Sequence, residues 1–212
     1  MNLILTIFLS YLIGAIPTSI IVSKLWKGID IRKYGSKNAG FTNVVRVLGW
    51  KPGIIVAIID LGKGLTATVF ISKISINSIN LDNTLIQILA GFSAIIGHIW
   101  TIFAGFKGGK GVLTALGMIT GLNPISAGIC FFIWAIIVYF SRYVSLGSIT
   151  SAICFPIVIF IEKYYFNKSI SEYLLIFSIL ICILIIYTHR ANIKRLISGT
   201  ENKFGKKTDK TI

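Results

Sequence analysis

The apolar residues of the chain form long, nearly uninterrupted runs that are separated by short polar segments. A helix needs about 20 apolar residues to cross the hydrocarbon core of a bilayer. Runs of about this length cover Leu3–Val22, Gly53–Ser72 and Thr84–Ala104, and slightly shorter runs cover Val144–Ile161 and Tyr173–Thr188. Each of these stretches is predicted to be a membrane-spanning helix.

One further apolar stretch, Val112–Phe140, is too long for a single comfortable span and contains Asn123 and Pro124 near its centre. We interpret it as two segments, Val112–Leu122 and Ile125–Phe140, that meet at a turn. The first is short enough to be a half-helix that its neighbours shield from lipid. The pattern therefore predicts an all-α integral membrane protein with about seven transmembrane helices, one of them short or broken. Five is the alternative if this pair does not span.

The composition agrees with a membrane protein. Hydrophobic residues make up 55% of the 212 residues, charged residues only 13%, and the mean hydropathy is +0.84. A soluble domain typically has about 25% charged residues, so a soluble enzyme, a coiled coil and a disordered protein are excluded. We find no internal repeat and no linker. We expect one polytopic domain over residues 1–212, with a basic, flexible tail at 203–212.

The net charge of +14 is distributed unevenly along the chain. If the N-terminus is outside, 17 of the 21 Lys and Arg residues lie in cytoplasmic segments, and only Lys73, Lys163 and Lys168 lie outside. Lys and Arg favour the cytoplasmic side of a membrane protein, where they also attract anionic lipid. We expect a multi-pass membrane protein that has a cytoplasmic C-terminus, contacts the lipid bilayer and binds no nucleic acid.

The first cytoplasmic segment contains GSKNAGFTNVVRVLG, from Gly35 to Gly49. It offers neutral hydrogen-bonding groups and, at Arg46, a guanidinium fork that suits phosphate. A helix is predicted to begin at Phe41, and loop donors before a helix start favour an anion site. A polar re-entrant loop with a snorkelling arginine is the alternative. The neutral candidates are Ser36, Asn38, Thr42 and Asn43.

The second segment, GFKGGKGV from Gly105 to Val112, has the composition of a phosphate cradle. It is not a P-loop, because Lys110 is followed by glycine and not by Ser or Thr. A flexible basic loop is the alternative. The candidate phosphate-binding residues are Lys107, Gly108, Gly109 and Lys110.

Two later segments add polar residues on the same predicted face. Ser145 follows a boundary pattern of Arg and Tyr. His189 and Asn192 are three residues apart and therefore share a helix face, which we expect to turn toward the other loops. Glu201 lies farther along the same segment, where an ordinary basic interfacial helix does not explain a carboxylate.

Within the predicted spans, Asp60 and Lys63 are also three residues apart. Ionisable groups inside a bilayer are functional candidates, but a structural ion pair is the favoured role here, and His98 is assigned to packing. The three cysteines lie in apolar segments without metal-ligand spacing. We therefore expect no metal and no cofactor.

Several blocks together resemble the PlsY family, the bacterial membrane glycerol-3-phosphate acyltransferases that use acyl phosphate as donor. They extend in the family's order from residue 14 to residue 203, and Lys37 stands where the family usually has glycine. The blocks are GAIPTS, GSKNAGFTNVVRVLG, DLGKG, GHIWTIFAGFKGGKGV, SRYVSL and HRANIKRLISGTENK.

The resemblance implies transfer of an acyl group from acyl phosphate to the 1-hydroxyl of glycerol 3-phosphate, at the cytoplasmic face and in phospholipid synthesis. It implies that the glycine-lysine loop and Ser145 bind substrate phosphate, with Glu201 structural. The proton goes either to His189 or to a substrate phosphate. No obligate protein partner is expected. The implied catalytic residues are Ser36, Arg46, His189 and Asn192.

The rival function is a membrane transporter of a small phosphorylated anion, since broken helices that face an anion also occur in carriers. A transporter needs a pathway to both faces. The predicted outside loops at residues 73–83 and 162–172 are short and contain few anion donors. The concentration of polar motifs on one face therefore favours an enzyme.

Overall fold

The computed structural model describes residues 2–76 and 80–205, and the part described is helical. Short 3-10 turns at Ile31–Lys33, Ile71–Ile74 and Ile102–Ala104 follow α2, α4 and α5. The helices are α1 (Asn2–Ala15), α2 (Thr18–Lys27), α3 (Phe41–Leu48), α4 (Trp50–Val69), α5 (Asn83–Ile99), α6 (Val112–Leu122), α7 (Pro124–Ser141), α8 (Val144–Tyr164), α9 (Glu172–Thr188) and α10 (Arg190–Ile197).

Among the described residues, five helical segments are long and apolar enough to cross a membrane, and a sixth is added if the pair α9 and α10, bent by 61°, counts as one span. Helix α6 is apolar but has only 11 residues, about 16 Å of helix. Large apolar side chains cover the outside of the bundle, among them Ile58, Phe132 and Phe140. The expectation of an all-helical, multi-pass membrane protein is thus confirmed.

The predicted span Leu3–Val22 lies within one candidate membrane span, Asn2–Lys27, but the helix of that span is interrupted. Helix α1 ends at Ala15 and α2 begins at Thr18. Pro17 lies between them and has no N–H to continue the helical ladder. The Ile16 carbonyl is left outside that ladder and accepts a hydrogen bond of 2.6 Å from the Lys63 ammonium of α4.

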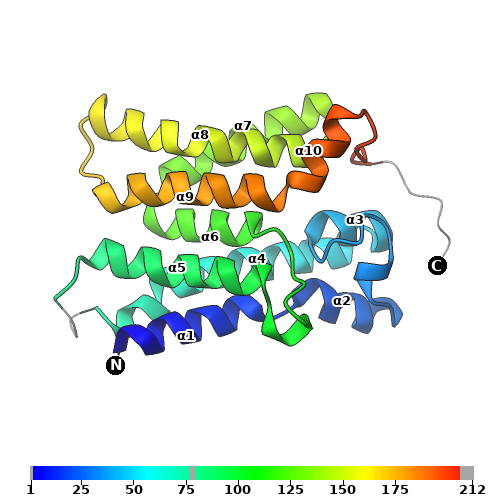
Figure 1. Ribbon diagram of the computed structural model, residues 1–212, viewed down its shortest axis with the longest axis horizontal. Coiled ribbons are helices and arrows are strands. Elements are labelled where there is room, and N and C mark those ends of the chain that lie inside the picture. The colour runs from blue at the N-terminus through cyan, green and yellow to red at the C-terminus, as the bar shows by residue number, and fades with distance from the viewer. Residues whose placement is uncertain (1, 77–79, 206–212) are drawn as a thin grey trace.

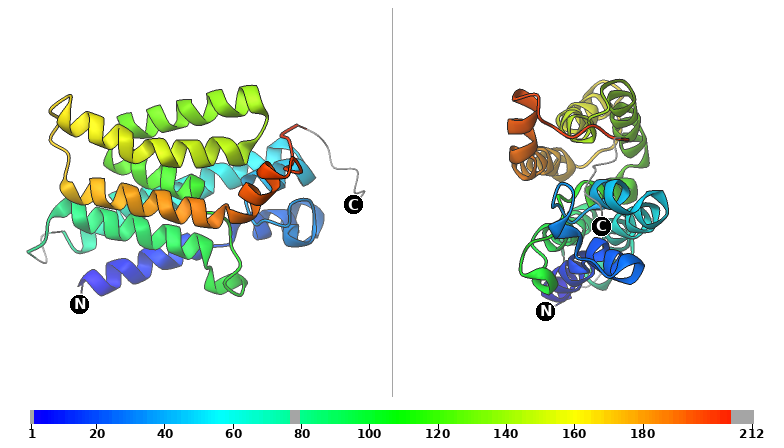
Figure 2. Two further views of the ribbon diagram at one scale, coloured as in Figure 1. Left: turned by 45° about the horizontal axis from the view of Figure 1, so that its top comes forward. Right: turned by 90° about the vertical axis from the view of Figure 1, so that its right-hand side faces the viewer.

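The helices form two groups with α6 between them. Helices α1, α4 and α5 lie on one side of α6, and α7, α8 and α9 lie on the other (Figures 1 and 2). The main apolar core fills the space between α5, α6, α8 and α9, where Ile95, Met118, Phe155 and Ile159 are buried. On this side Phe92 of α5 meets Phe177 of α9 edge to face.

The polar segments gather at one end of this bundle, where α2, α3 and α10 lie (Figure 1, right). The chain from α5 to α6 and the turn between α7 and α8 also reach this end. The predicted tail begins here: Phe204 donates its N–H to the Arg142 carbonyl at 2.7 Å and packs edge-on against Trp50. Residues 206–212 of that tail lie outside the described residues.

Candidate active site

A cavity of about 470 Å³ opens where these polar segments meet. It collects side chains that are far apart in sequence, because α3, α6, α8 and α10 all begin or end around it. The predicted site residues that line it are Ser36, Asn38, Thr42, Arg46, Asp60, Lys110, Ser145, His189, Asn192 and Glu201.

The first loop is held by Asn43, which the sequence groups with the ligand donors. Its buried side-chain amide accepts the Ser36 N–H at 2.8 Å and donates to the carbonyls of Ile31, Tyr34 and Asn38 at 3.0–3.2 Å. These bonds use both ends of the amide, so Asn43 shapes the loop and leaves ligand contacts to its neighbours.

Lys37, at the position where the resembling family usually has glycine, has a φ of 60°. This left-handed region disfavours residues that have a Cβ. The side chain is exposed, so the substitution changes the loop's conformational preference without filling the cavity.

Lys110 is the residue of the glycine-lysine loop that enters the cavity. Its ammonium donates a short hydrogen bond to the Asn192 side-chain oxygen, and its carbonyl accepts from the Thr188 hydroxyl at 3.2 Å. Burial lowers the pKa of Lys110 to about 8, with Glu201 opposing this shift and the charges of Arg195 and Arg46 adding to it.

The earlier part of that loop, residues 105–109, does not line the cavity. Lys107 is exposed. The backbone N–H groups of Gly108 and Gly109 donate to the carbonyls of Ile99 and His98 at 3.0 and 3.1 Å. A Cβ at Gly108 would meet the His98 carbonyl oxygen at 2.0 Å. In this arrangement the two glycines allow the loop to pack on α5 and their N–H groups bond its carbonyls, so phosphate binding by these residues stays a prediction.

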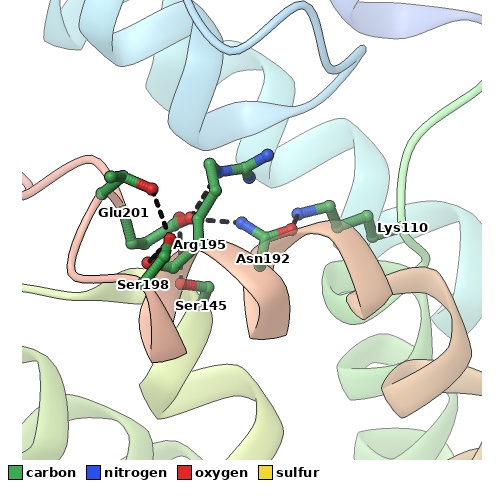
Figure 3. A network of polar contacts seen from close by, with 7 residues as sticks. Lys110, Ser145, Asn192, Arg195, Ser198 and Glu201 are labelled. Carbon is green, nitrogen blue, oxygen red and sulfur yellow. Dashed lines mark hydrogen bonds and ion pairs between the residues drawn. The ribbon is translucent and has the colours of Figure 1, made fainter.

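Glu201 joins three donors at the cavity mouth. Its carboxylate accepts hydrogen bonds from Asn192 at 2.8 Å, from Arg195 at 2.7 Å and from Ser145 at 3.1 Å. Figure 3 shows Asn192 between this group and Lys110. The sequence offers no separate signal for Arg195, which is one of several basic residues in this segment. Its three-residue spacing from Asn192 puts both on one face of α10.

His189 lies at the bend between α9 and α10 and is buried. Its Nδ1 is 2.8 Å from the Ile185 carbonyl oxygen. A carbonyl only accepts, so Nδ1 carries the proton and Nε2 is left as an acceptor. Burial, followed by the positive charge of Lys110, lowers the pKa of His189 to about 4. The imidazole is therefore neutral at neutral pH.

The mouth of the cavity has an excess of positive charge, because Arg46 and Lys110 line it and Arg195 lies beside Glu201. Arg46, Lys110 and Arg195 act on one another electrostatically, and Glu201 is the carboxylate that acts on both Arg46 and Lys110. Burial lowers the pKa of Arg46. A guanidinium is not deprotonated in proteins, so Arg46 remains charged. Such a group of cations suits ligands with phosphate groups.

A second polar cluster lies deeper, between α4 and α5. The Lys63 ammonium is 2.7 Å from an Asp60 carboxylate oxygen, and both side chains are at most 3% exposed. His98 Nδ1 is 3.7 Å from the same oxygen. The predicted ion pair is thus present. Lys63 also bonds the Ile16 carbonyl, so the pair fastens the break between α1 and α2.

Away from its polar mouth the cavity is apolar. Side chains of α6, α7, α8 and α9 line this part. It therefore offers an alkyl chain a dry site next to an anion site. The apolar lining includes Leu116, Ile119, Phe131, Trp134, Phe155, Ile181 and Ile185.

Comparison with known proteins gives one consistent result. The profile of the family described as glycerol-3-phosphate acyltransferase matches residues 4–199. A glycerol-3-phosphate acyltransferase of Chlorobaculum tepidum is 49% identical over 224 residues, which cover 95% of this chain and 97% of the relative. The enzyme of the same name from Chlorobium phaeobacteroides is 46% identical over 232 residues, covering 97% and 99%.

Two solved structures share the fold. Both are of PlsY (YgiH), an integral membrane glycerol 3-phosphate acyltransferase, one in a glycerol 3-phosphate form and one in a lysophosphatidic acid form. Their TM-scores are 0.85 and 0.83, each with 38% identity over 97% of this chain and 96% of theirs.

Proposed function

Because the chain belongs to the glycerol-3-phosphate acyltransferase family, we propose that it makes lysophosphatidic acid from glycerol 3-phosphate with acyl phosphate as donor. The observation that carries this is a cluster of cations at the mouth of an apolar cavity. Glycerol 3-phosphate and lysophosphatidic acid, named for the two solved relatives, are the acceptor and the product of this reaction.

The donor choice follows from charge. Glycerol 3-phosphate and acyl phosphate are both phosphate anions, so their approach requires several cations to offset their repulsion. Arg46 and Lys110 supply two of these in the cavity lining, and Arg195 supplies a third beside it. The acyl phosphate is already activated, so no covalent enzyme intermediate is needed.

In the proposed step, the 1-hydroxyl oxygen attacks the acyl carbon and the bond from that carbon to the phosphate oxygen breaks. The hydroxyl proton goes to a phosphate oxygen, and inorganic phosphate leaves. A phosphate group has a second pKa of about 6, whereas that of His189 is about 4. The phosphate is the better proton acceptor, and neutral His189 orients the hydroxyl through Nε2.

The other residues have binding and positioning roles in this proposal. Arg46 and Ser36 stabilise charge that develops on the donor phosphate during transfer. Lys110 and Asn192 bind the phosphate of glycerol 3-phosphate. Exposed Lys107 attracts anions to the mouth. The neutral donors Asn38, Thr42 and Ser145 complete the phosphate contacts.

We also propose that this end of the bundle faces the cytoplasm, with the N-terminus outside and seven crossings of which α6 is the short one. The distribution of 17 basic residues on one side against three on the other supports it. Single cysteines are introduced at positions 37 and 73 after the native cysteines have been replaced. With an impermeant reagent, the cysteine at position 37 should react only from the inside and the one at position 73 only from the outside. Labelling of position 37 from outside would reverse the orientation.

The reaction is tested with protein purified in detergent, incubated with glycerol 3-phosphate and acyl phosphate and analysed for lysophosphatidic acid and phosphate. Acyl-CoA and acyl carrier protein thioester are the comparison donors. We expect product with acyl phosphate alone, without nucleotide, metal or a partner protein. Turnover with a thioester donor but not with acyl phosphate would refute the proposed donor.

A further inference from the structure

The apolar part of the cavity ends against one buried side chain from each of four helices. These are Ile119 of α6, Cys130 of α7, Phe155 of α8 and Ile181 of α9, all of which line the cavity. None is more than 6% exposed, and Phe155, the largest, is 2% exposed. We refer to these four residues as the end wall.

The end wall lies at a definite depth below the polar mouth. Phe155 follows Ser145 by ten residues on α8, and Ile181 precedes His189 by eight residues on α9. With a helical rise of 1.5 Å per residue, the wall is about 12–15 Å from the residues that we assign to the phosphates. An extended alkyl chain whose head is held at the mouth therefore reaches it.

The wall is supported from behind. Ile159, one turn beyond Phe155, is fully buried in the same apolar cluster. At the level of the wall the Ser151 hydroxyl of α8 donates to the Cys130 carbonyl of α7 at 2.7 Å. Farther on, Glu162 of α8 accepts from Ser126 of α7 at 2.9 Å. These contacts fix α7 and α8 together, so a longer chain cannot extend the cavity by a small side-chain movement.

We propose that the end wall selects the length of the acyl chain, an inference that rests on the proposed function. Each methylene buried before the wall favours binding by about fourfold. A methylene that overruns the wall must displace close-packed side chains, which is unfavourable. The preference should therefore rise with length and then fall, with Phe155 setting the position of the fall.

The test is a competition in which dodecanoyl, tetradecanoyl, hexadecanoyl and octadecanoyl phosphate are present together. Mass spectrometry of the products gives ratios of kcat/KM, which do not depend on the amount of folded enzyme. Phe155→Ala deepens the cavity and should raise the share of the longest product relative to wild type by about fourfold or more. Ala152→Phe, which fills the cavity above the wall, should lower it by a similar factor.

Matched controls come from lipid-facing positions of the same helix. Phe160→Ala and Ile153→Phe make the same kinds of change at side chains that are 54% and 45% exposed and do not line the cavity. Both should keep the wild-type product profile. An unchanged profile in Phe155→Ala and Ala152→Phe, or an equal shift in the controls, would overturn the proposal.

A second measurement separates this inference from the proposed donor. Lysophosphatidic acids of the same chain lengths should raise the unfolding temperature in detergent. The chain length that gives the largest rise should differ between wild type and the variants Phe155→Ala and Ala152→Phe. This readout needs no turnover. If no acyl transfer from acyl phosphate occurs but the optimal chain length shifts in the variants, only the proposed donor is refuted. If transfer occurs but the optimal chain length stays the same, the role of the end wall is refuted.

Discussion

Asp60 and Glu201 are two of the buried carboxylates that have cationic partners, but their surroundings differ. Asp60 faces Lys63 in the interior, where the ammonium also bonds the Ile16 carbonyl. Glu201 lies at the cavity mouth among Arg46, Lys110 and Arg195 and accepts hydrogen bonds from three side chains. The inner cluster balances charge, whereas the outer one leaves positive charge in excess beside a cavity of about 470 Å³.

The difference shows which property identifies the site. Both clusters contain ionisable residues in an apolar protein, which makes each a functional candidate on composition alone. In the inner pair the Lys63 ammonium donates to the Asp60 carboxylate and to the Ile16 carbonyl, and so holds α4 against the break between α1 and α2. The outer cluster has surplus cations next to space for a ligand, whereas in the inner cluster Asp60 also lines the cavity but its charge is balanced by Lys63. The comparison predicts that mutations in the inner cluster change stability and those in the outer cluster change kinetics.

The largest effect is expected in the inner cluster. Asp60→Ala leaves the Lys63 charge buried without its carboxylate, which typically lowers the free energy of unfolding by about 3–5 kcal/mol. The double variant Asp60→Leu/Lys63→Met should recover more than half of that loss, because replacing both partners removes the unpaired charge. Thermal unfolding in detergent measures both. If the double variant were no more stable than Asp60→Ala, the unpaired Lys63 charge would not be the cause of the lost stability.

The next effect is kinetic. Arg46→Ala should lower kcat by about 10²–10³-fold, the range for losing a donor that stabilises transition-state charge, with an unfolding temperature near that of wild type. Arg46→Lys should also be poor, since an ammonium lacks the bidentate fork. Exposed Arg190, replaced by alanine, is the control. If kcat of Arg46→Ala stayed within about twofold of the wild-type value, a barrier change of about 0.4 kcal/mol, Arg46 would have no catalytic role and would only anchor α3 at the membrane interface.

Gly109 lies between the two clusters and tests whether they are separate. A Cβ there would be 2.2 Å from His98 Nε2 and 2.8 Å from the Ala39 carbonyl oxygen. Gly109→Ala should displace the loop that carries Lys110. We expect KM for glycerol 3-phosphate to rise about tenfold, equivalent to about 1.4 kcal/mol, with a smaller change in kcat. Steady-state kinetics with both substrates varied decide this, and an unchanged KM would contradict it.

The smallest effect concerns pH. Lys110, with a pKa of about 8, is charged below that pH and loses its charge above it. The value of kcat/KM for glycerol 3-phosphate should therefore fall severalfold between about pH 8 and 9, since this parameter reports ionisation of the free enzyme. The substrate phosphate is already dianionic there, its second pKa being about 6. Lys110→Arg should flatten this fall in kcat/KM. If the pH profile of that variant were identical to that of wild type, the fall would have to come from another group.

Much of the fold could be predicted because long apolar runs have one solution in a bilayer. The run Thr84–Ala104 corresponds closely to α5 (Asn83–Ile99) and the 3-10 turn after it. The break at Pro17 was not predicted, because apolar residues continue on both sides of it. The break is stabilised by a hydrogen bond from Lys63, which lies 47 positions away from Ile16. A contact between such distant residues leaves no trace in the pattern of apolar and polar positions.

The site was predictable where a polar residue is unusual in its surroundings. Lys110, His189 and Asn192 stand in short segments with a recognisable composition, and the fold brings them together. Arg195 was missed because one arginine in a basic segment has no local signal. Gly108 was assigned to ligand binding because composition identifies a flexible loop but not the partner of each N–H group.

The bend of 61° between α9 and α10 also has a consequence for biosynthesis. Glu201, which follows that bend, belongs to a cluster that also contains Arg46 and Lys110, far earlier in the sequence. Asn192 and Glu201 are synthesised after both of these cations. The hydrogen bonds that join Lys110 to Asn192 and Asn192 to Glu201 therefore form only after the residues that follow the bend have been made.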